Sequence, residues 1–264
     1  MSLKAILLRM REVIRLHVGA LFCAVSFLTV VPVHGLCPKD AIKVCGWLFP
    51  LVGLIIGAVV ATADSVLLSL VPMSVVSAIT VSMFVIITGG LHLDGLADLI
   101  DAIGSRKSGE EQLKVMREPQ IGAFGAAGIF IVLLLKYALI VSLEPNWRWT
   151  AILLSPMFGR YSAVVSMFLF PYARSEEGIA YHLRGHRIGQ TVAATIYTAA
   201  ATQICASYAG HICMWQCVAL SILISWRLVR RFGGLTGDCY GAIVEVCEVT
   251  SLLAFVMLQR FTNA

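Results

Sequence analysis

Three carboxylates stand close together in one short stretch of the chain, at Asp94, Asp98 and Asp101. Their spacing of i, i+4 and i+7 would place all three within a narrow arc of one helix face. Like charges gathered there repel one another, while Mg²⁺ prefers hard oxygen ligands and takes the rest from water and a substrate phosphate. The spacing therefore predicts a magnesium site with catalytic acids, against the alternative of a solvated acidic face at a membrane edge.

A second acidic group follows a glycine-rich turn late in the chain, where Asp238 is followed by Glu245 and Glu248. If this stretch is helical, Asp238 and Glu245 share a face, and the group could join the first acids at the same metal. Glycines let backbone N–H groups approach a phosphate, and a threonine hydroxyl adds a donor. The residues of the turn that we expect to contact phosphate are Gly233, Gly234, Thr236 and Gly237.

Four arginines are candidate phosphate ligands, because a guanidinium fork matches phosphate oxygens. They are Arg117, Arg160, Arg174 and Arg184. Arg160 lies inside an apolar run, so it should face the bundle interior and find an acid or a bound anion. For Arg174 and Arg184, a lipid-headgroup or topology charge is the alternative.

The sequence leaves open the roles of two further polar residues, His92 and Lys136. His92, beside the first acids, is a catalytic base or metal ligand, or else a hydrogen-bonded structural residue. Lys136, inside another apolar run, could pair with a structural partner or extend to the membrane surface. We assign Lys136 no role from the sequence.

The elements that must position these residues are membrane helices. Hydrophobic residues make up 59% of the chain and charged residues 13%, and the mean hydropathy is +0.87, which excludes an ordinary soluble domain. We expect an all-α, polytopic membrane bundle that forms one catalytic domain over residues 1–264. Seven apolar runs approach the ~20 residues needed to span a bilayer. They cover residues 44–61, 66–87, 121–143, 150–170, 188–206, 212–229 and 242–258.

The first 33 residues form a separate segment. Residues 1–18 alternate basic and apolar side chains at helical spacing, which is typical of an amphipathic helix in the membrane plane. Residues 21–33 are mostly apolar but too short to cross a bilayer, so we expect them to be re-entrant or interfacial.

The connections between the runs alternate in charge. Those around residues 34–43, 92–119, 171–187 and 227–238 are long and basic, whereas the turns near 63–65, 144–149 and 207–211 hold a single Arg148. By the positive-inside rule the basic set, which carries the candidate site residues, is cytoplasmic.

Cysteines do not suggest a covalent framework. The eight cysteines form no C-x-x-C pair, and no secretory signal precedes them. We therefore expect free thiols packed among helices, with neither disulfides nor a zinc site.

Four motifs together resemble the cobalamin synthase family, the adenosylcobinamide-GDP ribazoletransferases. They are Gly89–Asp98 with Asp101, Arg117–Gly125, Gly159-Arg160 with Pro171–Arg174, and Gly233–Asp238 with Glu245 and Glu248. The likeness covers nearly the whole chain. Glu118 is a departure, since the family is expected to carry Asp there.

The resemblance implies an enzyme of the bacterial inner membrane in the last steps of cobalamin biosynthesis. Such an enzyme joins adenosylcobinamide-GDP to α-ribazole or its 5′-phosphate, releases GMP and needs Mg²⁺. Its partners are these small molecules and the lipid bilayer, with no nucleic acid, and a homo-oligomer stays open. The alternatives are a Mg²⁺-dependent phosphotransferase for a lipid alcohol and a cation-coupled transporter; the latter should show repeated halves, and none is visible.

The charge pattern predicts the topology directly. Single cysteines introduced near Lys107, Ser175 and Gly234 should all be labelled from the cytoplasm and protected from an impermeant reagent in intact cells. Labelling of any of the three from the outside would contradict a shared cytoplasmic face.

Overall fold

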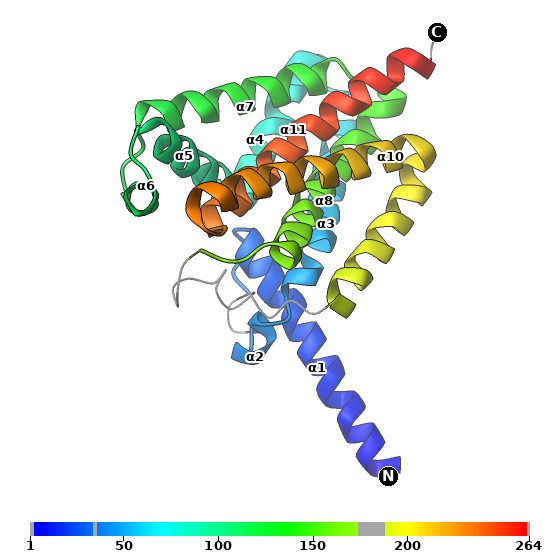
Figure 1. Ribbon diagram of the computed structural model, residues 1–264. Coiled ribbons are helices and arrows are strands. Elements are labelled where there is room, and N and C mark those ends of the chain that lie inside the picture. Colours follow the sequence, from blue (N-terminus) through cyan, green and yellow to red (C-terminus); the bar gives the residue numbers. More distant parts are fainter. Residues whose placement is uncertain (1–2, 34–35, 174–187, 263–264) are drawn as a thin grey trace.

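The computed structural model describes residues 3–33, 36–173 and 188–262, and its elements are helices joined by turns (Figure 1). In chain order they are α1 (Leu3–Leu28), α2 (Lys39–Ile42), the 3-10 helix η2 (Gly46–Leu48), α3 (Phe49–Leu67), α4 (Met73–Thr88), α5 (Leu91–Gly104), α6 (Glu110–Val115), α7 (Ala123–Val141), α8 (Pro145–Leu169), α10 (Ile188–Phe232) and α11 (Gly237–Thr262). The predicted all-α membrane bundle is confirmed.

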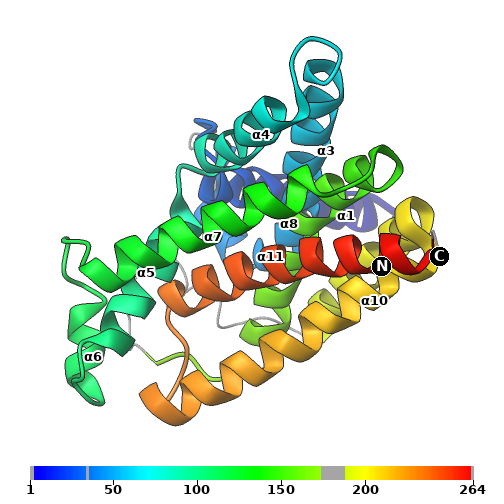
Figure 2. The ribbon, with the colours of Figure 1, turned by 90° about the horizontal axis from the view of Figure 1, so that it is seen from above.

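Helix α8 lies at the centre of the bundle. Every residue from Ala151 to Ser166 is buried, and the helix packs against α3, α10 and α11. Seen from above, α7, α11 and the second half of α10 run across one side, with α3 and α4 on the other (Figure 2). Because α8 is buried on all sides, any polar group on it must find its partner within the protein.

Two glycines one turn apart bring α3 against the backbone of α8. A Cβ atom on Gly53 would lie 2.8 Å from the carbonyl carbon of Pro156, and one on Gly57 would lie 2.8 Å from that of Leu153. Real side chains do not fit in such spaces, so these glycines set the separation of the two helices.

The number of spans differs from the seven predicted. Five helices of the described chain are long and apolar enough to cross a membrane, or six if the bent pair α4–α5 counts as one. Residues 188–206 and 212–229, expected as two spans, lie in two helices that meet at a kink at Ser207 and share the label α10. The predicted run 66–87 begins inside α3, and α4 has only 16 residues. The count of seven is therefore not confirmed.

A sharp bend separates α4 from α5. The two helices meet at 89°, and Gly89 and Gly90 adopt φ values of 61° and 71°. Both values lie in the left-handed region, which glycine enters without a steric cost. The bend directs α5, with its three aspartates, away from the line of α4.

A buried ion pair joins α3 to α8. The guanidinium of Arg148 donates to the two carboxylate oxygens of Asp64 at 2.6 and 2.8 Å and to the carbonyl of Ile140 at 2.6 Å. The hydroxyl of Thr80 on α4 donates to the same carboxylate at 2.6 Å. Arg148 is thus a structural residue that connects four helices, and not merely a charge in a turn.

One helix runs through both parts of the N-terminal segment, the amphipathic residues 1–18 and the part from residue 21 that was expected to be re-entrant or interfacial. Helix α1 continues to Leu28 and is not among the candidate spans. Its N-terminal half extends away from the bundle (Figure 1) and exposes Met10, Ile14 and Val18 by 50% or more. These apolar side chains agree with an amphipathic helix.

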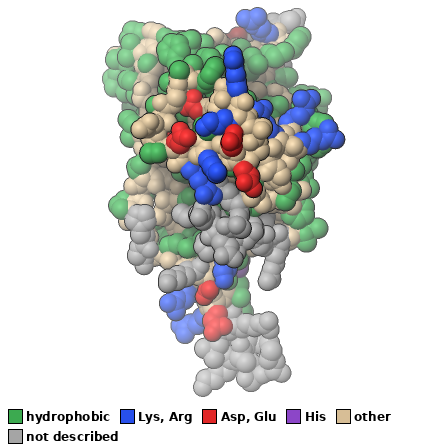
Figure 3. All heavy atoms as spheres, turned by 60° about the vertical axis from the view of Figure 1, so that its left-hand side comes forward, with side chains coloured by type: hydrophobic (Ala, Val, Ile, Leu, Met, Phe, Trp, Pro, Cys, Tyr) green, Lys and Arg blue, Asp and Glu red, His purple; other side chains and the backbone are tan. Residues whose placement is uncertain are grey.

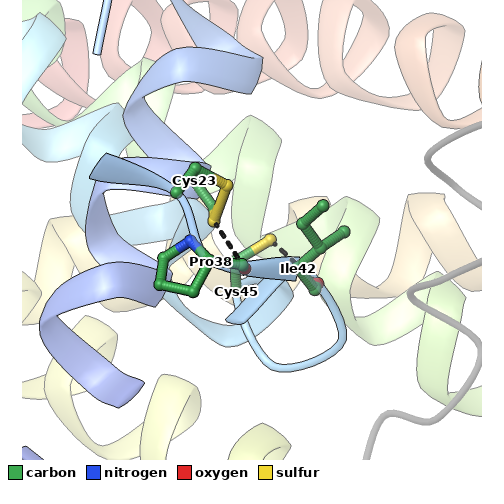
Figure 4. Close-up of a disulfide and its surroundings, with 5 residues drawn as sticks. Cys23, Pro38, Ile42 and Cys45 are labelled. Atoms are coloured by element: carbon green, nitrogen blue, oxygen red, sulfur yellow. Dashed lines mark hydrogen bonds between the residues drawn. A yellow bond between two sulfur atoms is a disulfide. The ribbon is translucent and has the colours of Figure 1, made fainter. Parts of the chain in front are cut away.

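The expectation of free thiols throughout is also wrong. Cys23 of α1 and Cys37 form a disulfide (Figure 4). Pro38 packs against Gly19, where a Cβ atom would lie 2.8 Å from the proline ring, and this contact returns Cys37 to the side of α1. Their spacing of 14 residues matches no pattern that a sequence reveals. The other six cysteines, all within the described residues, remain as thiols.

The close α3–α8 contact can be tested by Gly57→Ala. The added methyl group would meet the α8 backbone, so we expect a loss of about 1–3 kcal/mol in stability, typical of overpacking. The loss is measured as a lower melting temperature of the detergent-solubilised protein, with unfolding followed by size-exclusion chromatography. The matched control is Gly189→Ala, where an added Cβ has no atom within 4 Å. Equal melting temperatures for the two variants would contradict the contact.

Candidate active site

The first acidic group lies on one helix, as predicted. Helix α5 carries Asp94, Asp98 and Asp101 along its length. Asp94 is exposed, and the other two are partly buried. Figure 3 turns the side of the molecule that bears α5 and α6 toward the reader, and acidic and basic side chains gather there amid apolar surface. A charged face therefore interrupts the apolar exterior beside the candidate site.

The structure brings Asp238, the first residue of the second acidic group, to the first group. A Cβ atom on Gly95 of α5 would lie 2.9 Å from the Cα atom of Asp238, and one on Gly241 would lie 3.1 Å from the carbonyl oxygen of His92. Glycine on each helix thus lets the two backbones touch. Asp238, in the first turn of α11, consequently lies beside the turn of α5 that holds Asp94 and Asp98.

Asp101 has a different environment. Its two carboxylate oxygens accept the backbone N–H groups of Gly122 at 2.7 Å and of Gly125 at 2.8 Å. These are N–H groups of the first turn of α7, which have no partner within that helix. Asp101 therefore caps α7 from a neighbouring helix, and the glycines leave room for its carboxylate. Whether it also binds metal stays a prediction.

The glycine-rich turn pairs with the segment after α8. The N–H of Ala173 donates to the carbonyl of Leu235 at 2.8 Å, and the N–H of Leu235 donates to the carbonyl of Pro171 at 2.8 Å. A Cβ atom on Gly234 would lie 2.6 Å from the Ala173 nitrogen. Two of the motifs thus form one continuous backbone surface.

Two residues of the predicted phosphate loop are already engaged. The N–H of Gly233 donates to the carbonyl of Val229 at 2.8 Å. Thr236 is buried, and its hydroxyl oxygen accepts the N–H of Cys239 at 3.3 Å, which caps α11. Gly237 remains exposed in the first turn of that helix. A phosphate role for any of them stays a prediction.

Behind this surface lies a cluster of buried charges. Lys136 of α7 donates to Glu245 at 2.7 Å and to Glu248 at 2.6 Å, both on α11. Arg160 of α8 pairs with Glu248 and donates to the Nδ1 atom of His92 at 3.3 Å. The prediction that Arg160 faces inward and meets an acid is confirmed. Whether Arg160 also contacts phosphate stays a prediction.

The contact with Arg160 limits what His92 can do. A guanidinium only donates hydrogen bonds, so the Nδ1 atom of His92 must be the acceptor, and the ring proton of the neutral form lies on Nε2. His92 is 7% exposed. In this arrangement neither nitrogen is placed to accept a proton, which favours the structural reading of His92 over the role of base.

Of the remaining candidate phosphate ligands, the structure describes one and leaves two outside its described residues. Arg117 is exposed next to the C-terminal end of α6, whereas Arg174 and Arg184 lie outside the described residues. Within the described ranges, no group of three or more His, Cys, Asp or Glu side chains is arranged to hold a metal. This does not exclude Mg²⁺, which often uses only one or two carboxylates and fills its shell with water and substrate phosphate.

Sequence reasoning missed the role of Lys136. The signal was present, because a cation inside one apolar run and two acids inside another must each find a partner in the bundle. What the sequence did not supply was the packing of α7 against α11, which decides that Lys136 takes both acids.

Comparison with known proteins gives one consistent result. The family model described as cobalamin-5-phosphate synthase matches residues 20–256. The chain is 35% identical to an adenosylcobinamide-GDP ribazoletransferase of Roseiflexus sp. over 89% of its length and 88% of the relative's. It is 37% identical to an adenosylcobinamide-GDP ribazoletransferase of Pseudomonas savastanoi pv. phaseolicola over 80% of its own length and 86% of the relative's. No solved structure matches.

The capping role of Asp101 predicts the effect of Asp101→Asn. An amide can accept through one oxygen only, so its NH₂ group would face a backbone N–H, and we expect a loss of about 1–3 kcal/mol in stability. Asp94→Asn is the control, because Asp94 is exposed and should unfold like the wild type. Thermal unfolding of both variants decides, and unchanged stability in Asp101→Asn would remove the capping role.

Proposed function

Because the chain belongs to the cobalamin-5-phosphate synthase family, we propose that it joins adenosylcobinamide-GDP to α-ribazole, or to α-ribazole 5′-phosphate, and releases GMP. The product is adenosylcobalamin or its 5′-phosphate. The observation that carries this proposal is the meeting of three distant motifs at one place. The acidic turn of α5 touches the start of α11 at Gly95, and the turn before α11 pairs with the segment after α8.

The reaction requires charge neutralisation and a proton acceptor, and the contact between α5 and α11 offers groups for both. A hydroxyl oxygen of the ribazole forms a bond to the phosphorus that bears cobinamide, the bond from that phosphorus to the GMP oxygen breaks, and the hydroxyl loses its proton. The site must neutralise negative oxygens and receive that proton. Backbone N–H groups at the start of α11 favour an anion, and the carboxylates of α5 and α11 are the available bases.

We also propose that Mg²⁺ assists this reaction. One or two of Asp94 and Asp98 on α5 and Asp238 on α11 would bind such an ion, because they are hard oxygen donors on two helices whose backbones touch at Gly95, and water and substrate phosphate would complete its shell. Bound there, the ion would neutralise phosphate oxygens and stabilise the leaving group. Glu245 and Glu248 are less suited, since Lys136 and Arg160 already bind their carboxylates.

The distribution of basic side chains supports a location and an orientation in the membrane. The chain is a multi-pass membrane protein, and we propose that it lies in the bacterial inner membrane with its active face in the cytoplasm. Exposed basic side chains lie in the segments that follow α5 and precede α11: Arg106, Lys107 and Lys114 before α7, and Arg227 and Arg230 near the end of α10. On the opposite side, where the end of α11 lies beside the start of α8, Arg148 is buried with Asp64, and Arg260 is an exposed exception. This asymmetry agrees with the positive-inside rule.

Release of GMP tests the function. The purified protein, given adenosylcobinamide-GDP and α-ribazole, should release GMP and form a cobalamin only when Mg²⁺ is present. Asp94→Asn removes a ligand charge, so we expect the Mg²⁺ concentration for half-maximal turnover to rise at least ~10-fold, the loss typical of even an outer ligand partner.

The control is Glu12→Gln, an exposed acid on α1 far from the site in sequence, which should behave like the wild type. A wild-type protein that releases no GMP from these substrates would refute the function. A normal Mg²⁺ requirement in Asp94→Asn would refute only the assignment of this ligand.

A further inference from the structure

We propose that Lys136 is a positioning residue for the active site: it acts through Glu248, Arg160 and His92 to fix helix α5. We call these four residues the polar chain. Lys136 touches none of the acids of α5 itself, and it stands 109 residues before Glu245, its nearer partner in sequence.

The polar chain crosses four helices by direct contacts. Lys136 on α7 binds Glu248 on α11 at 2.6 Å, Glu248 pairs with Arg160 on α8, and Arg160 donates to His92 on α5 at 3.3 Å. Every member is at least nine-tenths buried. Bulk water therefore does not solvate these groups, and each side chain is held by the next.

His92 is well placed to transmit this constraint. It lies in the first turn of α5, two residues before Asp94, and its backbone packs against Gly241. One side of the turn is thus fixed by α11, and the imidazole is fixed by Arg160. Loss of the contact with Arg160 would leave a buried imidazole nitrogen without its donor and free the turn that carries Asp94.

Charge balance explains why Lys136 is needed. The cluster contains two cations, Lys136 and Arg160, and two acids, Glu245 and Glu248, in direct contact. Without Lys136, both acids have Arg160 as their nearest cation. The guanidinium would then be drawn toward α11 and away from His92, because two buried carboxylates must share one partner.

The inference is tested by Lys136→Met, which keeps the length of the side chain and removes its charge. Hydrogen exchange of the full-length protein in detergent, followed by mass spectrometry, should show faster exchange in residues 91–104 than in the wild type. GMP release should fall about 10- to 100-fold, as for loss of a group that orients ligands. The loss of turnover rests on the proposed function, but the exchange measurement does not.

Two further variants separate positioning from general destabilisation. Lys136→Met combined with Glu245→Gln leaves Glu248 paired with Arg160 and restores neutrality, so exchange in α5 should return toward the wild-type rate. Arg148→Met breaks the other buried ion pair. It should speed exchange in α3 and α4, which hold its partners Asp64 and Ser77, and leave α5 protected.

Each outcome decides one question. Unchanged exchange of α5 in Lys136→Met, or no recovery in the double variant, would overturn the positioning role whatever the protein catalyses. Faster exchange of α5 in Lys136→Met, reversed in the double variant, would support the role even if the wild type released no GMP. That last result would refute the proposed function alone.

Discussion

A charge in the apolar interior of a membrane bundle must be paired inside the protein, and this requirement fixes the arrangement of the helices. Helix α8 carries two buried arginines, Arg148 and Arg160, which are separated by about 18 Å at 1.5 Å per residue. The first binds Asp64 of α3 and the second binds Glu248 of α11. Ion pairs at two positions along α8 therefore fix α3 and α11 along the axis of α8 as well as their distance from it.

Glycine sets how closely those neighbours approach. Gly57 lets α3 touch α8, Gly95 and Gly241 let α5 touch α11, and Gly125 makes room for the carboxylate of Asp101 beside α7. Lipid offers little hydrophobic driving force between helices, so close backbone contact is the main source of packing energy. The same contacts that stabilise the bundle bring two acidic segments together, although 144 residues separate Asp94 from Asp238.

Features that depend on nearby residues could be predicted from the sequence. The apolar runs gave the fold class, and the spacing of the aspartates gave the helix α5. Features that depend on distant partners could not. Nothing near Asp101 indicates that it caps α7, and nothing near Cys23 indicates Cys37 as its partner. The break between the apolar runs 188–206 and 212–229, by contrast, is a local feature and was predicted: the helix is interrupted at Ser207, whose φ of 47° and ψ of −133° are not helical.

The distance in sequence between buried partners also has a consequence for biosynthesis. Ribosomes deliver α7 to the membrane before α11 exists, so Lys136 must enter the bilayer about a hundred residues ahead of its acids. A lysine costs about 2.5–3.5 kcal/mol at the centre of a lone helix on insertion scales, and less at Lys136, which lies five residues before the end of α7. Helix α7 is the most apolar candidate span of the described chain, which offsets this cost. Insertion thus precedes pairing, and the cluster forms as the last helix arrives.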